Sequence, residues 1–243
     1  MKILALESSA LVAGVAVIED DNLLGEYTMN HKKTHSQTLL PMLQALTEMI
    51  DLDMNTIDAI AVSKGPGSFT GLRIGSATAK GLGLALDKPI IPVPTVDAMA
   101  YNLWGTDKLI CPLMDARRQQ AYTGLYCFNE GELETIIEQC AVDISEIVEQ
   151  INGKNQEVIF LGDGVPVFAE YLSQHVTVPY TLAPANCNRQ SAASVALLAQ
   201  KLYQQGVVEA AAEHKPDYLR LSQAERELAE RSGDGEKGRD FTV

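Results

Sequence analysis

The sequence is poor in positive charge and in aromatic residues. Its 243 residues include 19 lysines and arginines against 32 aspartates and glutamates, a formal net charge of -13, and only 6% are aromatic. Such an acidic chain opposes docking onto a phosphate backbone. Basic residues adjoin one another only at Lys32-Lys33 and at Arg117-Arg118. The sequence therefore shows no cluster of basic residues of the kind that binds nucleic acid.

Cysteine patterns and long apolar runs are absent as well. Cys111, Cys127, Cys140 and Cys187 have no Cys-x-x-Cys spacing, so we interpret them as reduced, mostly buried small hydrophobes rather than disulfides or zinc ligands. The N-terminus reaches Glu7 after four apolar residues, too few for a secretory or membrane segment. We therefore expect a cytoplasmic protein without a membrane segment. The apolar content of 46% predicts that the chain folds around a core.

What is present is an alternation of strand and helix patterns. Residues 3–6, 12–18 and 23–29 predict three strands in meander order, and 36–50 predict a helix with Ser36 as its cap and a local kink at Pro41. The rest of the first half predicts a strand at 57–62, a helix at 69–86, a strand at 90–93 and a helix at 95–104. This order is typical of a ribonuclease H-like half-domain with one mixed sheet.

The second half repeats the pattern. Strands are predicted at 109–114, 120–128 and 158–161, and helices at 144–151, 165–172 and 191–203. In both halves the first predicted strand is followed directly by an acidic residue, Glu7 or Asp115, which suggests an internal duplication. We therefore expect two lobes, 1–105 and 106–222, followed by a polar tail at 223–243 that we expect to be disordered.

The most specific segment joins a buried strand to a helix through a glycine-rich loop. It contains Gly65, Pro66, Gly67, Ser68 and Thr70. One interpretation is a phosphate cradle, because free amides and the helix dipole favour anions at a helix N-terminus. The other is a tight structural turn, since neither a P-loop nor Gly-x-Gly-x-x-Gly spacing is present. Spacing favours the turn without excluding the cradle.

Small residues recur at every fourth position of the helix after this loop. Such a stripe allows another element to approach closely, and glycine inside a helix costs about 1 kcal/mol relative to alanine without a packing reason. The element that approaches could be this protein's own sheet or a helix of a second protein. The neighbouring helix also carries the extra apolar residues Leu40, Met42 and Met49. We therefore predict an intermolecular interface at Leu39, Leu43, Leu46, Gly71, Leu72, Gly75, Ala79 and Gly83.

Several residues that could carry chemistry have simpler interpretations. His31 and His35 are four apart, but they precede the expected helix cap and lack a third ligand, so we interpret them as a solvated pair. His175 and His214 stand in polar surroundings and suggest no site. We interpret Asp115 with Arg117 as an ion pair at the domain junction.

Five segments together resemble one protein family. The glycine-rich block is the most specific of them, and the resemblance spans about residues 1 to 222. It resembles the bacterial TsaB (YeaZ) proteins at Leu4-Ala5-Leu6-Glu7-Ser8-Ser9, His35-Ser36-Gln37-x-Leu39-Leu40-Pro41, Gly65-Pro66-Gly67-Ser68-Phe69-Thr70-Gly71-Leu72-Arg73-Ile74-Gly75, Asp115-Ala116-Arg117 and Pro216-x-Tyr218-Leu219-Arg220.

The resemblance implies an actin-like (ASKHA) α/β fold of two ribonuclease H-like lobes, with a mixed five-stranded sheet in the first. It also implies a non-catalytic subunit of the machinery that installs threonylcarbamoyl on N6 of adenosine 37 in tRNAs reading ANN codons. The implied partners are the catalytic relative TsaD, the ATPase TsaE and, without TsaD, a second copy of the chain. Contact with tRNA is expected only through the complex.

The absence of catalysis rests on three positions in this comparison. Where the catalytic relative has an aspartate and a His-x-x-x-His metal pair, this chain has Leu11, Thr95 and Met99. None of these is a usual ligand for a hard catalytic metal. We therefore expect no cofactor on this chain, with ATP and metal on TsaD and TsaE. The alternatives are a metallo-glycopeptidase-like enzyme, a regulatory nucleotide-binding protein of the same superfamily and a tRNA-binding module.

Overall fold

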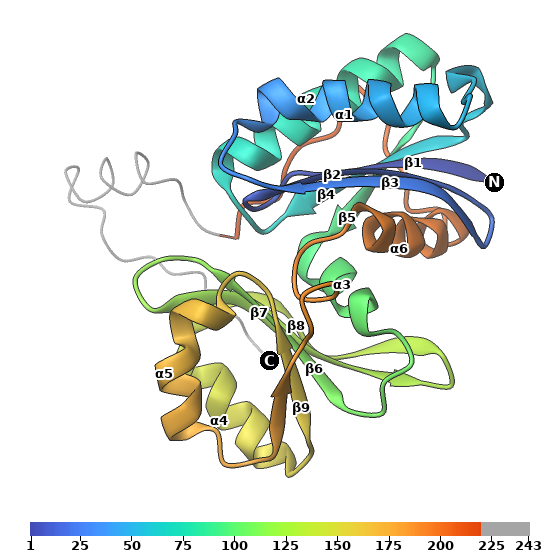
Figure 1. Ribbon diagram of the computed structural model, residues 1–243. Coiled ribbons are helices and arrows are strands. Elements are labelled where there is room, and N and C mark those ends of the chain that lie inside the picture. Colours follow the sequence, from blue (N-terminus) through green and yellow to red (C-terminus); the bar gives the residue numbers. More distant parts are fainter. Residues whose placement is uncertain (220–243) are drawn as a thin grey trace.

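A computed structural model describes residues 1–219 of the chain, as two five-stranded sheets with helices between and outside them (Figure 1). The tail expected at 223–243 lies outside the described residues. No helix within 1–219 is both long and apolar enough to cross a bilayer.

The first sheet is mixed, as expected. Its strands are β1 (Lys2–Glu7), β2 (Val12–Glu19), β3 (Asn22–Asn30), β4 (Ala59–Gly65) and β5 (Ile90–Pro94), in the order β3-β2-β1-β4-β5. The first three pair antiparallel and the last two continue parallel to β1. The central strands β1 and β4 are apolar along nearly their whole length because helices cover both faces.

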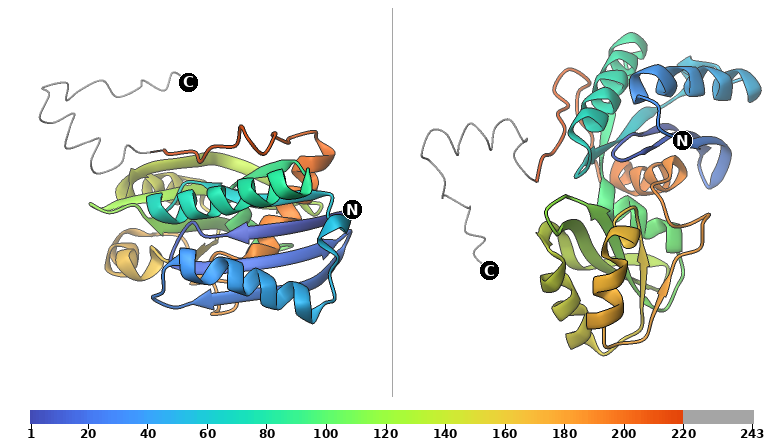
Figure 2. Two further views of the ribbon diagram at one scale, coloured as in Figure 1. Left: turned by 90° about the horizontal axis from the view of Figure 1, so that it is seen from above. Right: turned by 60° about the vertical axis from the view of Figure 1, so that its left-hand side comes forward.

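Helices α1 (His35–Met49) and α2 (Phe69–Leu86) cover the outer face of this sheet (Figure 1). The inner face is covered by α6 (Ala192–Gln204), which packs mainly on β1, β2 and β5. Seen from above in Figure 2, α1 and α2 lie side by side across the sheet. The first lobe is therefore a sandwich of helices, sheet and helix.

The second sheet has the same topology as the first. Its order is β10-β9-β6-β7-β8, with the antiparallel pairs β6–β7 and β7–β8 and the parallel pairs β6–β9 and β9–β10. The equivalence supports the expected duplication and gives the two-lobed, actin-like architecture. The strands are β6 (Leu109–Asp115), β7 (Gln120–Asn129), β8 (Glu132–Asp143), β9 (Val158–Leu161) and β10 (Tyr180–Leu182).

Helices α4 (Ile144–Lys154) and α5 (Val165–His175) cover the far face of the second sheet (Figure 1). Asp143 and Glu146 form a capping box that starts α4. Helix α3 (Thr95–Ala100) connects the lobes and contacts β6 and β7. Short 3₁₀ turns, η1 (Met54–Thr56) and η2 (Tyr101–Leu103), complete the described elements.

The expected division into 1–105 and 106–222 differs from the structure in one respect. Helix α6 was expected in the second lobe, but Val195, Ala196 and Ala199 form one core with Ile3 and Ile91 of the first sheet. The physical reason is that the inner face of the first sheet is apolar and needs a cover. The order of the elements in the sequence does not show that α6 packs back onto the first sheet.

Three smaller features differ from the predicted elements. Strands β8 and β10 were not predicted: β8 is a half-exposed edge strand whose acidic residues interrupt the apolar pattern, and β10 is only three residues long. The cap of α1 is Thr34 rather than Ser36, and α1 runs through Pro41.

Candidate functional site

The turn after β1 forms the floor of the cleft between the lobes, and a buried carboxylate holds it. Glu7 accepts hydrogen bonds from the amide and the hydroxyl of Ser9, both at 2.6 Å, and from the hydroxyl of Ser63. Burial raises the pKa of Glu7, and the bonds from Ser63 and Ser9 lower it in part. The carboxylate therefore supports the backbone of the turn.

Helix α2 packs directly onto this turn. A Cβ on Gly71 would lie 2.0 Å from the carbonyl oxygen of Ser8, and one on Gly75 would lie 2.3 Å from the Ser8 hydroxyl oxygen. Towards the other end, a Cβ on Gly83 would lie 2.7 Å from the Cβ of Ala211. The stripe of small residues therefore serves contacts within this chain.

This placement corrects the predicted interface. All eight residues are buried in the chain itself, so they cannot form a surface for a second protein as they stand. The physical reason is that the stripe faces the apolar sheet and the β1 turn, the alternative that spacing could not separate. The buried residues are Leu39, Leu43, Leu46, Gly71, Leu72, Gly75, Ala79 and Gly83.

The side of α1 and α2 that faces solvent is formed by other residues. Leu40 is 53% exposed, Met49 85% and Leu84 63%. Gln44 on α1 and the small residues Ala77 and Gly81 on α2 are exposed as well. We call these six residues the outer helix face. The extra apolar residues noted in the sequence, Leu40 and Met49, belong to this face, whereas Met42 is buried.

His35 is also fixed to the turn, which corrects its interpretation as a solvated residue. It is the first residue of α1, it is buried, and its Nε2 atom lies 2.7 Å from the carbonyl oxygen of Ala10. His31 remains exposed. Because His35 and Gly71 contact the same turn, the starts of α1 and α2 are held together there.

The glycine-rich loop is packed against the same turn. The amide of Ser68 donates to the carbonyl oxygen of Ser9 at 2.6 Å, and the Ser68 hydroxyl accepts from the amide of Gly71 at 3.3 Å. A Cβ on Gly67 would lie 2.3 Å from the Ser9 oxygen. Two amides that a phosphate would need are thus already bonded, which favours the structural turn over the cradle.

Gly65 and Pro66 are buried and Thr70 is exposed at the edge of the cleft. Gly65 has φ 122°, and a Cβ there would lie 2.2 Å from the carbonyl oxygen of Asp217. Only glycine suits both requirements at this position. The C-terminal part of the described chain therefore depends on the loop as well.

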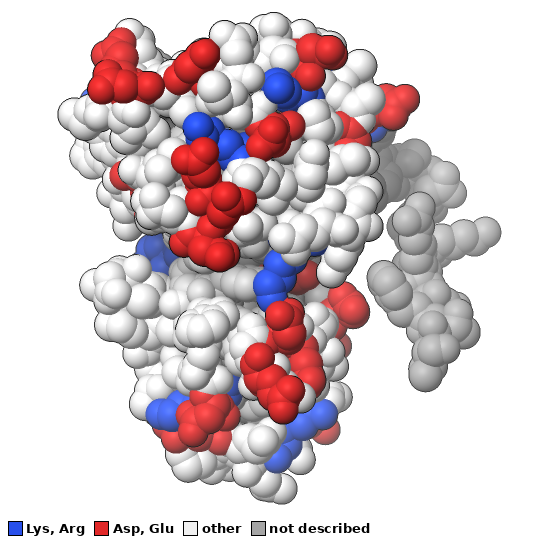
Figure 3. Space-filling model, turned by 90° about the vertical axis from the view of Figure 1, so that its right-hand side faces the viewer, with Lys and Arg blue, Asp and Glu red and all other residues white. Residues whose placement is uncertain are grey.

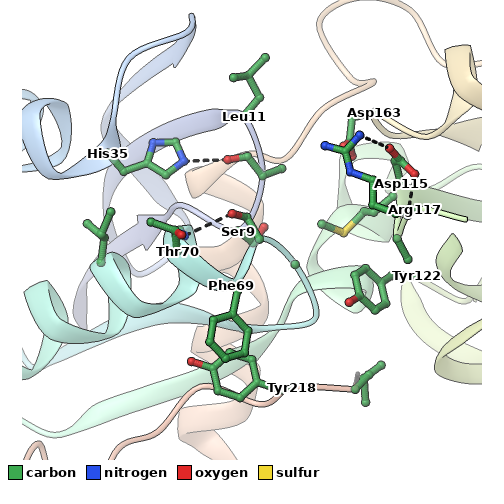
Figure 4. Close-up of a pocket in the computed structure, with 18 of the residues that line it drawn as sticks. Ser9, Leu11, His35, Phe69, Thr70, Asp115, Arg117, Tyr122, Asp163 and Tyr218 are labelled. Carbon is green, nitrogen blue, oxygen red and sulfur yellow. Dashed lines mark hydrogen bonds and ion pairs between the residues drawn. The ribbon is translucent and has the colours of Figure 1, made fainter. Parts of the chain in front are cut away.

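The cleft has a volume of about 550 Å³ and walls from both lobes (Figure 4). The second lobe contributes Asp115, Arg117 and Asp163. Asp115 and Arg117 form an ion pair at 3.2 Å, which confirms that expectation. Burial raises the pKa of Asp163, while a hydrogen bond from Gln190 at 3.3 Å lowers it in part.

The positions expected to lack metal ligands lie in and beside this cleft. Leu11 is 48% exposed and lines the cleft wall. Thr95 and Met99 are buried at the start and in the middle of α3, and the sulfur of Met99 accepts from Gln190 at 3.5 Å. Within 1–219, no three His, Cys, Asp or Glu side chains come together as a metal site.

Sequence reasoning missed part of the cleft wall. Asp217 and Tyr218 line it from the C-terminal part of the described chain. The ring of Tyr218 stacks on Phe69 with the centroids 4.2 Å apart, as Figure 4 shows, and its hydroxyl accepts from Nε of Arg73 at 3.2 Å. A Pro-x-Tyr motif gives no local signal for such a distant contact.

Acidic side chains gather in groups over both lobes on the face shown in Figure 3, with basic side chains scattered among them. This face has no continuous basic surface for a nucleic-acid backbone.

Known proteins resemble the chain along most of its length. The profile of the family described as "TsaD: tRNA N6-adenosine threonylcarbamoyltransferase" matches residues 22–228. The "tRNA threonylcarbamoyladenosine biosynthesis protein TsaB" of Bacillus subtilis is 34% identical over 95% of this chain and 99% of its own length. The protein of the same name from Escherichia coli is 28% identical over 94% of this chain and 98% of its own.

A solved structure is similar as well. "YeaZ from Pseudomonas aeruginosa" superposes with a TM-score of 0.76 at 25% identity, and the match covers 90% of this chain and 99% of that one.

Proposed function

Because this chain belongs to the TsaB (YeaZ) family, we propose that it is a non-catalytic subunit for threonylcarbamoylation of adenosine 37 in ANN-decoding tRNAs. It takes part in tRNA threonylcarbamoyladenosine biosynthesis, the process for which its relatives are named. Its specific role would be to bind and activate the catalytic relative TsaD, together with the ATPase TsaE. Without TsaD, a second copy of the chain would occupy the same face, and tRNA would be reached only through the complex.

The observation that carries this proposal is the outer helix face. Leu40, Met49 and Leu84 expose large apolar side chains on two adjoining helices. Exposed apolar surface of this kind indicates a protein interface, and the small residues Ala77 and Gly81 allow a partner helix to come close.

The charge of this region supports a protein partner. Among the exposed positions of α1 and α2, only Glu48 and Arg73 are charged, although the whole chain has a formal net charge of -13. Protein interface cores are depleted in charged residues in the same way. A pair of helices from a second protein would complete a four-helix interface here.

Binding to TsaD tests the proposal directly. Ala77→Glu and Leu84→Glu should each weaken the affinity at least about tenfold, since a charge buried in an interface core costs well over 1.4 kcal/mol. Val167→Glu is the matched control, because Val167 is 58% exposed on α5 of the other lobe. All three variants should keep the thermal stability of the wild type. Wild-type affinity in both face variants would refute the docking surface.

The non-catalytic part of the proposal is supported by Leu11, Thr95 and Met99, which offer neither a carboxylate nor an imidazole. A regulatory nucleotide-binding role is the second candidate, since the cleft of about 550 Å³ has room for a small ligand and carries Asp115 and Asp163 on one wall. Calorimetric titration of the isolated chain with ATP and Mg²⁺ separates the two. Turnover of ATP by the isolated chain would contradict the accessory role.

A further inference from the structure

Residues 207–219, which we call the C-terminal strap, run along the flank of α2. The strap leaves α6 and pairs with β5, where Glu209 and Ile90 exchange two backbone hydrogen bonds of 2.8 and 2.9 Å. It ends at the cleft with Tyr218 stacked on Phe69. In the left view of Figure 2, the strap and α1 lie on opposite sides of α2.

Polar contacts anchor the strap along its length. The Nζ atom of Lys80 on α2 donates to the carbonyl oxygens of Ala212 at 2.9 Å and His214 at 3.2 Å. The amide of Asp217 donates to the carbonyl oxygen of Lys64 on β4 at 2.7 Å. Little apolar surface joins the strap to the core, since Ala211 is its one buried hydrophobic side chain. Its attachment thus depends largely on polar groups.

His214 lies at the centre of these contacts with its side chain fully buried. Its Nδ1 atom is 3.0 Å from Oε2 of Glu209, so Nδ1 carries the proton and donates to the carboxylate. Its Nε2 atom is buried and has no hydrogen-bond partner within residues 1–219. The neutral ring therefore fits the site, with Nδ1 hydrogen-bonded and Nε2 left without a hydrogen bond in the described part of the chain.

Protonation would place a second N–H and a positive charge in this position. Besides Glu209, the charged groups that act on the ring are Lys80 of α2 and Lys64 of β4, and the strap's own Glu213 and Lys215 are exposed. Burial lowers the pKa of His214; Glu209 raises it in part and the two lysines lower it. A buried cation with an unpaired N–H next to two lysines is unfavourable.

We propose that the C-terminal strap is a pH-sensitive clip, which protonation of His214 releases from α2 and β4. Release would remove Asp217 and Tyr218 from the cleft wall and uncover one flank of α2. The clip belongs to the isolated chain and does not depend on the proposed partner.

The direction of the effect follows from linkage. A released strap exposes His214, whose pKa then returns to about 6.5. Because the pKa is lower in the attached state, attachment is fully stable above about pH 6.5 and weakens as pH falls through the lowered pKa.

Amide hydrogen exchange of the full chain tests the clip. Wild-type amides of Glu209 and Asp217 should be protected at about pH 7.5 and, after correction for intrinsic rates, should exchange about tenfold faster at about pH 5.5. His214→Gln keeps a neutral donor toward Glu209 and should show equal protection at both pH values. His31→Gln, a change at an exposed histidine, should respond as the wild type does.

Equal wild-type protection at both pH values would overturn the clip, and so would a pH response that persists in His214→Gln. If His214→Gln fails to fold, NMR titration of the wild type decides. The His214 ring and the strap amides should then shift with one shared midpoint below about pH 6.5. Strap amides that ignore the titration of His214 would refute the proposal.

Discussion

The carbonyl oxygen of Ser8 lies where a side chain on Gly71 would have to be. A Cβ built on Gly71 comes within 2.0 Å of that oxygen, and the Ser8 hydroxyl donates to the Gly71 carbonyl at 2.9 Å. The first turn of the chain and the start of α2 are thus in backbone contact. The helices that form the outer face are positioned by the same turn that floors the cleft.

Gly71→Ala and Gly75→Ala should therefore destabilise the fold itself. Overpacking at such contacts typically costs roughly 1–3 kcal/mol. Gly81→Ala is the matched control in the same helix, because within residues 1–219 no atom outside the helix's own backbone lies within 4 Å of its Cβ position; it should be neutral or stabilising by up to about 1 kcal/mol. Urea denaturation of the three variants measures the differences. Unchanged stability in Gly71→Ala would contradict the close contact.

The spacing of the glycines in α2 predicted that another element packs closely on this helix, but it did not predict which element. Four-residue spacing correctly indicated that something approaches α2 closely, but the same spacing suits a sheet of the same chain or a helix of another protein. The position of the turn after β1 decides which of the two packs on α2, and this position is set by pairings between strands that are distant in the sequence. The predicted interface residues were wrong for this reason, although the choice of helices remains a prediction.

Strands and helices of the first half were predictable because buried runs and turn residues alternate there. His214 was not, since the groups that act on it, Lys80 of α2 and Lys64 of β4, lie more than 100 residues away in the sequence, and its polar sequence neighbours suggested solvent. Helix α6 was recognised as a helix, yet its return to the first sheet depends on which apolar face lacks a cover. Local patterns therefore predict elements better than they predict their partners.

Glu7→Gln should change how stability depends on pH. The folded-state pKa of Glu7 is raised above its ordinary value of 4.5, so its contribution is fully present below about pH 4.5 and is lost as pH rises through the folded pKa. The glutamine variant lacks this titration. Its free energy of unfolding, measured by denaturant, should therefore gain on that of the wild type between about pH 4.5 and pH 8. A constant difference over this range would mean that Glu7 does not titrate there.

Cys111 should be inert to alkylation in the folded protein. Its side chain is fully buried, its sulfur lies 3.4 Å from the hydroxyl of Thr123, and burial raises its pKa to about 12. Because only the thiolate reacts, iodoacetamide at about pH 8 should label Cys187, which is only half-buried, much faster than Cys111. Mass spectrometry of digested native and unfolded samples measures both rates. Equal labelling of the two residues in the native protein would contradict the burial of Cys111.

Residues 1–105 should not fold alone, although they contain the whole first sheet. The inner face of that sheet, with Ile3, Ile18 and Ile91, is covered by α6. Each such side chain loses about 1.5–3 kcal/mol when it is exposed, so the three together lose about 4.5–9 kcal/mol, a loss comparable with the roughly 5–15 kcal/mol that stabilises a whole domain.

Joining residues 1–105 to 190–219 through a flexible linker should restore folding, since this adds α6 and the strap. Amide dispersion in NMR spectra compares the two fragments. A well-dispersed spectrum for 1–105 would show that the sheet can do without its inner cover, and the first lobe would then end where the sequence suggested. A poorly dispersed spectrum for 1–105 and a well-dispersed one for the joined fragment would show that the first lobe is built from residues 1–105 and 190–219 together. In that case the outer helix face and the strap belong to one cooperative folding unit, and a substitution that destabilises one would also destabilise the other.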